Sequence, residues 1–160
     1  MKFWKSQWGG QIWFSFGSNQ SAGVAILQGK FKGTVLRQMA DTEGRWIMLL
    51  TETDQSQFLI INTYGYNNKQ HNKQLFLVLE EKIEQILLSF PTAKTPWGGD
   101  FNTVMNDNLD RWPPRNHMST ELHYICDRLG IIDIWRSRHV NKTSYTWTNK
   151  DRTQQSRMDF

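Results

Sequence analysis

The chain has 160 residues, of which 38% are hydrophobic and 21% charged, as expected for one globular domain with a buried core. Its start has no apolar run of signal-peptide length, and 18 apolar residues never follow one another, so the sequence predicts neither secretion nor a membrane span. The only cysteine, Cys126, excludes an internal disulfide and is expected to be a buried structural thiol.

The net charge of +4 comes entirely from the last fifty residues. Residues 1–110 contain ten Lys or Arg and ten Asp or Glu, whereas residues 111–160 contain nine and five. Most of this excess is arginine, whose planar guanidinium suits phosphate oxygens. The arginines are Arg111, Arg115, Arg128, Arg136, Arg138, Arg152 and Arg157. As a group they favour a polyanionic partner such as DNA, although for any one of them taken singly a solvated surface residue is the favoured explanation.

The first 64 residues predict strands joined by turns. Alternating or apolar runs bounded by turn residues occupy residues 11–16, 23–27, 34–40, 45–53 and 57–64. Residues 46–50 and 58–61 are apolar without alternation, which predicts strands covered on both faces.

Two amphipathic helices and two later strands are predicted next. Apolar residues at three- and four-residue intervals indicate a helix from about 71 to 89, ended by Pro91, with Glu80, Glu81 and Glu84 facing water. A second helix carries Leu122, Ile125, Cys126 and Leu129 on one face, with Ser119 or Thr120 as N-cap and Gly130 as its stop. Residues 144–148 and 158–160 are expected to be strands. Strands followed by helices and further strands indicate sheet layers with helices packed outside them.

A carboxylate and a carboxamide lie two positions apart after a glycine pair, in Gly98-Gly99-Asp100-Phe101-Asn102-Thr103. On an extended backbone Asp100 and Asn102 would point the same way and could converge on a water, a metal ion or a phosphate oxygen. The alternative is an ordinary Gly-Asp turn, in which Asp and Asn bond their own backbone. Pro96, just before this motif, weakens the prediction of a full central strand there because proline lacks a ladder donor.

Five motifs resemble a known family in their order and spacing. They are Asn62-Thr63-Tyr64-Gly65-Tyr66, Gly98-Gly99-Asp100-Phe101-Asn102, Leu109-Asp110-Arg111-Trp112, Ser144-Tyr145-Thr146-Trp147 and Ser156-Arg157-Met158-Asp159-Phe160. Across essentially the whole chain the pattern resembles the endonuclease domain of LINE-type (non-LTR) retrotransposons, a branch of the AP-endonuclease-like endonuclease/exonuclease/phosphatase superfamily. The resemblance implies an α/β fold, part of a four-layer sandwich of two packed sheets with outer helices, and a single incomplete domain over residues 1–160.

The resemblance also implies catalytic roles in phosphodiester hydrolysis. Asp100 would orient and deprotonate the attacking water, and Asn102 would donate to the phosphate. Tyr64 would contact the scissile phosphate, although a strand-end tyrosine half buried for its ring explains it as well. Asp159 would orient an active-site histidine. A divalent metal, usually magnesium, assists the family's reaction.

Four further residues are expected to face the substrate, which would be DNA. Thr146 matches a threonine of a substrate-side strand and Ser156 the serine that opens the last motif, although both could be strand hydroxyls without a role. Arg111 and Arg157 belong to the same motifs and carry the fork that suits phosphate.

Two family motifs do not occur in these 160 residues: the Glu-Thr whose glutamate is the main metal ligand, and Ser-Asp-His. We therefore expect a fragment truncated at both ends, with no metal ligand of its own. Its activity should be very low, because catalytic residues that act as a unit lose most of their effect when one of them is removed. Alternatives are a non-catalytic nucleic-acid-binding remnant, a phosphatase branch of the superfamily, or no function for the chain alone. In a full-length element a reverse transcriptase domain would follow, and the product would be intracellular and, if functional, nuclear.

Overall fold

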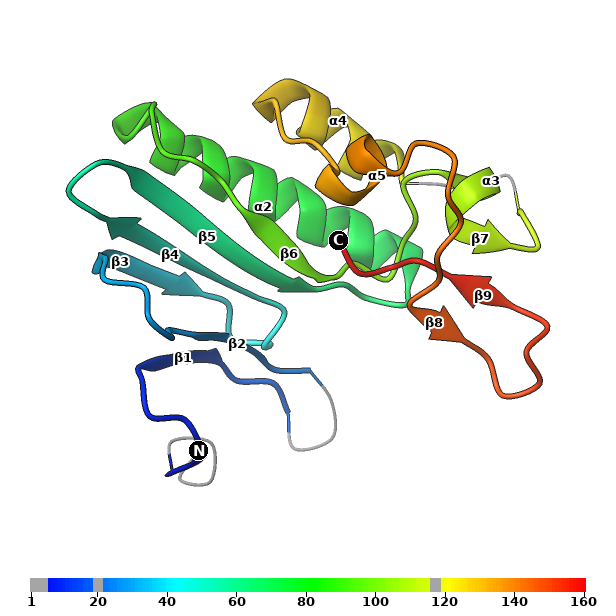
Figure 1. The fold of residues 1–160 in the computed structure, drawn as a ribbon, viewed down its shortest axis with the longest axis horizontal. Helices are drawn as coiled ribbons and strands as arrows, with labels where there is room; N and C mark the ends of the chain where they lie inside the picture. Colours follow the sequence, from blue (N-terminus) through cyan, green and yellow to red (C-terminus); the bar gives the residue numbers. More distant parts are fainter. Residues whose placement is uncertain (1–5, 19–21, 116–118) are drawn as a thin grey trace. The chain divides into compact units, whose positions relative to one another are not determined.

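The computed structural model describes residues 6–18, 22–115 and 119–160. These residues form two compact units, shown within the ribbon of Figure 1. The first unit is the chain up to Tyr64 together with Leu87–Gly98, and the second is Gly65–Ile86 together with Gly99–Phe160. Helix α2 (Lys69–Ser89) and strand β6 (Trp97–Asp100) each contribute to both units. The single domain expected from the sequence stays a prediction.

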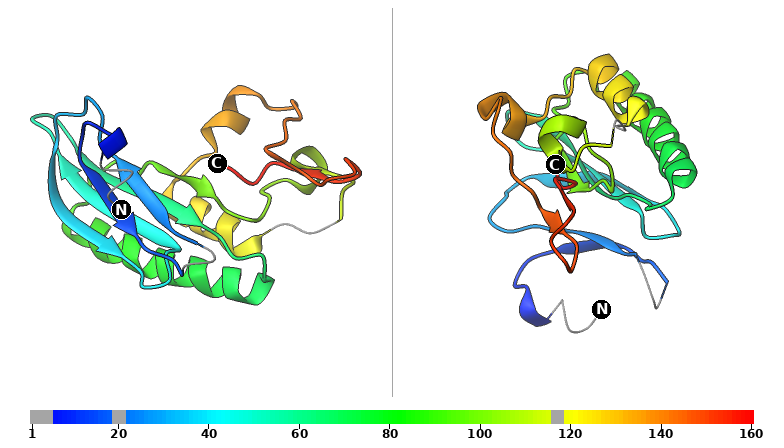
Figure 2. Two further views of the ribbon diagram at one scale, coloured as in Figure 1. Left: turned by 90° about the horizontal axis from the view of Figure 1, so that it is seen from below. Right: turned by 90° about the vertical axis from the view of Figure 1, so that its right-hand side faces the viewer.

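The first unit is built from a hairpin and an antiparallel sheet, which two further views display in Figure 2. The hairpin pairs β1 with β2, and the sheet has the order β3-β4-β5-β6, with β3 to β5 antiparallel. The strand bounds are Ile12–Ser15 for β1, Val24–Leu27 for β2, Thr34–Ala40 for β3, Trp46–Glu52 for β4 and Gln57–Tyr64 for β5. All five strands predicted in this region are therefore confirmed to within two residues. The turn between β1 and β2 lies partly outside the described residues.

Strand β4 forms the core of the first unit. Every residue from Trp46 to Leu50 is at most 7% exposed, which confirms the strand covered on both faces. The same prediction was wrong for residues 58–61, because Leu59 and Ile61 are buried whereas Phe58 and Ile60 are only half-buried. Strand β5 thus has one deeply buried face and one partly open face.

Pro96 is bonded to strand β5 through its carbonyl group alone. The segment before β6 runs parallel to β5, and the N–H groups of Leu59 and Ile61 donate to the carbonyls of Lys94 (2.8 Å) and Pro96 (2.9 Å). The Lys94 N–H also donates to the Gln57 carbonyl (2.9 Å), so the equivalent ladder position two residues on, opposite Leu59, lacks a donor because Pro96 has no N–H. Strand β6 begins at the next residue and stands at the end of the sheet order, so it is not the full central strand of the family pattern.

The second unit contains the two predicted helices. Helix α4 spans Thr120–Leu129, its N-cap Ser119 accepts from the Leu122 N–H (3.1 Å), and Gly130 ends it in the left-handed conformation (φ 64°). The sequence predicted each of these signals, and Cys126 is buried on this helix as expected.

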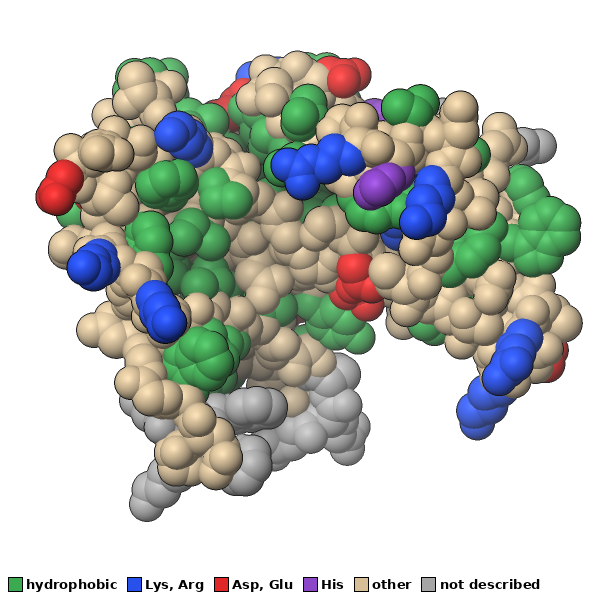
Figure 3. Space-filling view, in the orientation of Figure 1, with side chains coloured by type: hydrophobic (Ala, Val, Ile, Leu, Met, Phe, Trp, Pro, Cys, Tyr) green, Lys and Arg blue, Asp and Glu red, His purple; other side chains and the backbone are tan. Residues whose placement is uncertain are grey.

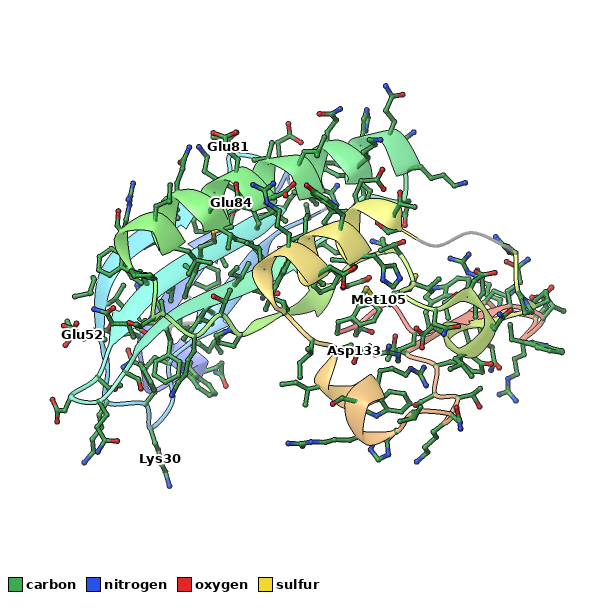
Figure 4. The ribbon with its side chains drawn as sticks, turned by 90° about the horizontal axis from the view of Figure 1, so that it is seen from above. Lys30, Glu52, Glu81, Glu84, Met105 and Asp133 are labelled. Atoms are coloured by element: carbon green, nitrogen blue, oxygen red, sulfur yellow. The ribbon has the colours of Figure 1, made fainter. Side chains whose placement is uncertain are left out.

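One prediction about helix α2 was wrong. Glu80 is buried rather than facing water. The Arg128 guanidinium on α4 lies 2.7 Å from the Glu80 carboxylate, and the same guanidinium lies 2.5 Å from the Glu84 carboxylate. Figure 4 shows these two helices side by side, with Glu81 on the side of α2 away from α4. Lys73 and Glu121 form a second ion pair between the same helices (2.9 Å).

The second unit also contains short elements, most of which the sequence did not predict. These are helices α3 (Asp107–Asp110) and α5 (Ile134–Arg138) and a small sheet of order β7-β9-β8, with β7 at Arg111–Trp112, β8 at Trp147–Thr148 and β9 at Gln155–Ser156. The strand predicted over 144–148 is thus shorter, and the one over 158–160 was wrong, since that segment makes only an isolated bridge at Asp159. The overall class is mixed α/β with several sheets and helices, as predicted. Among the described residues no helix has the length and apolarity to span a membrane.

Candidate active site

The Asp100–Asn102 segment turns instead of continuing as a strand. Asn102 has a positive φ of 49°, and its N–H donates to Oδ1 of Asp100 at 3.0 Å. Of the two geometries that the sequence left open here, the extended one does not occur at Asn102. The structure forms the alternative, an aspartate bonded to its own backbone two residues on, and asparagine tolerates the left-handed region better than most residues.

This turn is bonded to the segment that precedes helix α2. The N–H of Gly65 donates to the carbonyl of Asp100 (2.7 Å), and the Asn102 carboxamide donates to the carbonyl of Gly65 (2.8 Å). Gly65 approaches so closely that an added Cβ would lie 2.2 Å from the Phe101 carbonyl oxygen. Only glycine fits here without displacing backbone, so the turn is held at a fixed place.

Asn72 completes this set of bonds and was missed by the sequence analysis. It is 5% exposed, donates to the Phe101 carbonyl (3.0 Å) and accepts from the Tyr66 N–H (2.9 Å). The available signal was its spacing, since Asn72 precedes Leu75, Phe76 and Leu79 by three, four and seven residues on the apolar face. A polar residue at such a position needs partners, and the backbone of Tyr66 and Phe101 provides them.

Asp159 is placed beside Asp100 by the bonds around it. The two residues form an isolated antiparallel bridge, flanked by mutual Gly99–Phe160 bonds (3.2 Å each) and by a bond from the Phe101 N–H to the Met158 carbonyl (2.7 Å). Burial raises the pKa of the Asp100 carboxyl and the charge of Asp159 adds to this, whereas the Asn102 N–H acts to lower it. Asp100 therefore holds its proton to a higher pH than an ordinary aspartate.

A buried ion network anchors the chain just before Asp159. Arg157, 3% exposed, donates to both oxygens of Asp110 (2.9 and 3.3 Å) and also to Asp133, which Figure 4 labels. Asp110 is fully buried and also accepts from Arg136. The Arg157 guanidinium stands over the Phe160 ring at 4.3 Å. These contacts assign Arg157 an internal role, and its predicted contact with substrate stays a prediction.

Two solved structures have a fold similar to that of this chain. The chain resembles the solved structure of truncated TDP2 from Caenorhabditis elegans (TM-score 0.58, 19% identity, 94% of this chain and 59% of that one). It also resembles the endonuclease domain of TRAS1, a telomere-specific non-LTR retrotransposon (TM-score 0.57, 12% identity, 93% of this chain and 64% of that one). These likenesses show that the chain shares the fold of these two solved structures over part of their length. It thus spans about three fifths of these two solved chains.

A sequence relative comes from a transposon. The chain is 25% identical over 161 residues to the transposon TX1 uncharacterized 149 kDa protein of Xenopus laevis, matching 98% of this chain and 12% of that protein. No family model matches the chain. The predicted resemblance to LINE-type endonucleases is therefore supported by structural neighbours and by a transposon homologue.

The other predicted site residues lie in several environments. Thr146 is exposed and its hydroxyl accepts from the Met158 N–H (3.1 Å). Ser156 is 7% exposed in β9, opposite Arg111 of β7, whose guanidinium pairs with Asp107 at 2.9 Å. Their expected contacts with substrate stay predictions.

Tyr64 belongs to the first unit, where it ends strand β5. Its ring is half-buried, with the Arg45 guanidinium 5.0 Å from the ring centroid, and its N–H donates to the Arg45 carbonyl at 2.7 Å. Both a catalytic hydroxyl and a packed ring fit this environment. The structure brings Asp100, Asn102 and Asp159 together within the second unit.

The arginines of the last fifty residues do not all serve one surface. Arg111, Arg128, Arg136 and Arg157 make ion pairs with acidic side chains of the second unit. On the face drawn in Figure 3, the blue Lys and Arg side chains stand apart from one another and form no continuous patch. Arg138 and Arg152 are exposed and available to a polyanion.

Proposed function

We propose that this chain is part of the metal-dependent DNA-nicking endonuclease of a non-LTR retrotransposon. The endonuclease/exonuclease/phosphatase fold and the transposon homologue support this proposal. The observation that carries it is the fixed turn in which the Asp100 carboxyl accepts the Asn102 N–H while the Asp100 backbone pairs with that of Asp159. A carboxyl group and a carboxamide held together in this way can activate a water and bind a phosphate oxygen.

Asp100 would act as the general base. A base works best when its pKa lies near the working pH, and burial with the neighbouring charge of Asp159 raises the pKa of Asp100 in that direction. Oδ1 accepts the Asn102 N–H, so Oδ2 is the oxygen that would take the proton from the attacking water. Asp159 would then help to set the basicity of Asp100 through its charge.

Asn102 would bind a non-bridging phosphate oxygen. A carboxamide nitrogen carries two hydrogens, and its bond to the Gly65 carbonyl uses one of them. The second would donate to the substrate from an amide already held in place. Preorganised donors of this kind stabilise developing charge without reorganising during the reaction.

Magnesium belongs to this proposal as an expectation from the resemblance. Within residues 6–18, 22–115 and 119–160, no three His, Cys, Asp or Glu side chains gather in a way that could hold a metal ion. A magnesium ion in this family helps to stabilise negative charge on the phosphate. DNA as substrate, a following reverse transcriptase domain and nuclear localisation are proposed on the same basis.

A nicking assay tests the proposal. We expect the longest translated product of this gene that contains residues 1–160 to relax supercoiled plasmid in the presence of magnesium. Asp100→Ala and Asn102→Ala should each lower the rate by about 10²–10³-fold, the effect of removing one preorganised contact. An unchanged rate in Asp100→Ala would remove this residue from catalysis.

The same samples separate the proposal from a non-catalytic nucleic-acid-binding role, which the basic last fifty residues would favour. Such a protein would bind DNA with an affinity that falls steeply with salt and would not cleave it. Turnover of a small phosphomonoester without nicking would instead favour the phosphatase branch.

A further inference from the structure

Two separate segments of the second unit meet at one buried side chain. Asn72 lies in the first turns of helix α2, and its backbone N–H already donates to the Asn68 carbonyl (2.9 Å) as part of the helix. Its side chain is left to bond elsewhere. One end of the carboxamide bonds to the Tyr66 N–H and the other to the Phe101 carbonyl, so the residue joins the helix to the loop that carries Asp100 and Asn102.

The direction of these bonds requires a carboxamide. The oxygen faces an N–H donor and the nitrogen faces a carbonyl acceptor, so a rotated amide would set donor against donor and acceptor against acceptor. A carboxylate would keep the bond to Tyr66 but place negative charge against the Phe101 carbonyl. An apolar side chain of similar size would remove both bonds, although it would fill the same buried place.

The bond to the Phe101 carbonyl affects the orientation of the next N–H group. It belongs to the peptide that leads directly into Asn102, the residue with positive φ, and the N–H of that same peptide donates to Asp100 Oδ1. Fixing one side of a peptide plane fixes the other, since the peptide unit is planar. Asn72 therefore controls the direction of the N–H that Asp100 accepts.

We propose that Asn72 is a positioning residue of the site, whose carboxamide orients the Phe101–Asn102 peptide and thereby the Asp100 carboxyl. Helix α2 provides the rigid support, and side chains locked by such secondary contacts hold reacting groups more accurately than loops do alone. The role of Asp100 in this inference rests on the proposed function, whereas the orientation by Asn72 does not.

The test uses the 160-residue chain and NMR, without any activity. In the native chain the amide proton shift of Asn102 should follow the titration of the Asp100 carboxyl, because the two are hydrogen-bonded. In Asn72→Leu this dependence should disappear, and amide exchange at Tyr66 and Asn102 should become faster by about fivefold or more, the factor that corresponds to one net hydrogen bond. In Asn72→Asp exchange should increase at Asn102 but not at Tyr66.

Two controls keep the result interpretable. Asn67→Ala removes an exposed asparagine of the same region and should change neither amide. The amide of Ile125, in the buried face of α4, should exchange at its native rate in both Asn72 variants. If the Asn102 shift still follows the Asp100 titration in Asn72→Leu, or if all amides of the unit exchange faster by the same factor, the positioning role is refuted.

This outcome is separable from that of the proposed function. If no product of the gene nicks DNA while Asn72→Leu uncouples Asn102 from Asp100, the nuclease proposal fails and the positioning role stands. In a product that does nick, Asn72→Leu should lower kcat by about 10–100-fold, the usual effect of removing an outer partner of a site, with little change in DNA affinity.

Discussion

Replacing Arg157 with methionine removes a buried cation from between two carboxylates. The change deletes the two bonds to Asp110 and the bond to Asp133, together with the guanidinium contact over the Phe160 ring. Removing one partner of a buried pair typically costs about 3–5 kcal/mol. The lower end applies here, because Asp110 keeps Arg136 and the Asn106 N–H as partners. We therefore expect about 3 kcal/mol.

Urea unfolding followed by circular dichroism measures this change in the free energy of unfolding. For a chain of this length about 3 kcal/mol corresponds to a fall in Tm of roughly 6–12 °C. Arg138→Met, an exposed arginine of helix α5, is the matched control and should change stability by less than about 0.5 kcal/mol. If Arg157→Met and Arg138→Met unfold at the same urea concentration, the network does not anchor the segment before Asp159.

Four further substitutions probe the site and its support. Asp159→Asn should lower the pKa of the Asp100 carboxyl toward its ordinary value, measured by carbon NMR, because the like charge is removed. A raised pKa means that the folded state holds the Asp100 proton more tightly than the unfolded state does. The free energy of unfolding therefore falls as pH rises from the ordinary aspartate pKa through the raised value. Asp100→Asn should reduce this fall. Gly65→Ala should destabilise by about 1–3 kcal/mol, because its Cβ would meet the Phe101 carbonyl at 2.2 Å. Ser119→Ala should cost about 1 kcal/mol through the lost N-cap of α4.

Matched controls accompany the two stability changes. A Cβ at Gly9 would meet nothing within 4 Å, so Gly9→Ala should leave the urea midpoint unchanged. Thr120→Ala changes an exposed residue next to the cap and should cost less than Ser119→Ala. Equal effects at Gly65 and Gly9, or at Ser119 and Thr120, would contradict the close approach and the cap respectively. An Asp100 pKa that does not move in Asp159→Asn would show that the two carboxyl groups do not interact.

The parts of the fold that the sequence predicted are those with strong local signals. Strands β3 to β5 carry long apolar or alternating runs, and α4 has a complete set of cap, apolar face and glycine stop. The elements that were missed are short and depend on distant partners. Helix α5 has five residues, and its N-cap Asp133 also binds Arg157, a contact that no local pattern reveals.

The candidate site was predicted in composition but not in geometry. The motif order placed Asp100, Asn102 and Asp159 among the candidates, and the structure brings them together in the second unit. The orientation of the Asn102 side chain did not follow from the sequence, because the positive φ of this residue depends on its bond to Gly65, 37 residues earlier in the chain. Asn72 was missed because it lies in a helix whose periodicity had been explained by its apolar residues alone.

The buried thiol of Cys126 has a practical consequence for anyone who studies this chain. It is 9% exposed, burial raises its pKa to about 11, and no other cysteine competes for a thiol reagent. Thiolate is the reactive form, so the folded chain should resist alkylation and react only when α4 opens. The rate of labelling thus reports the opening of this helix in the native sequence, with no introduced probe.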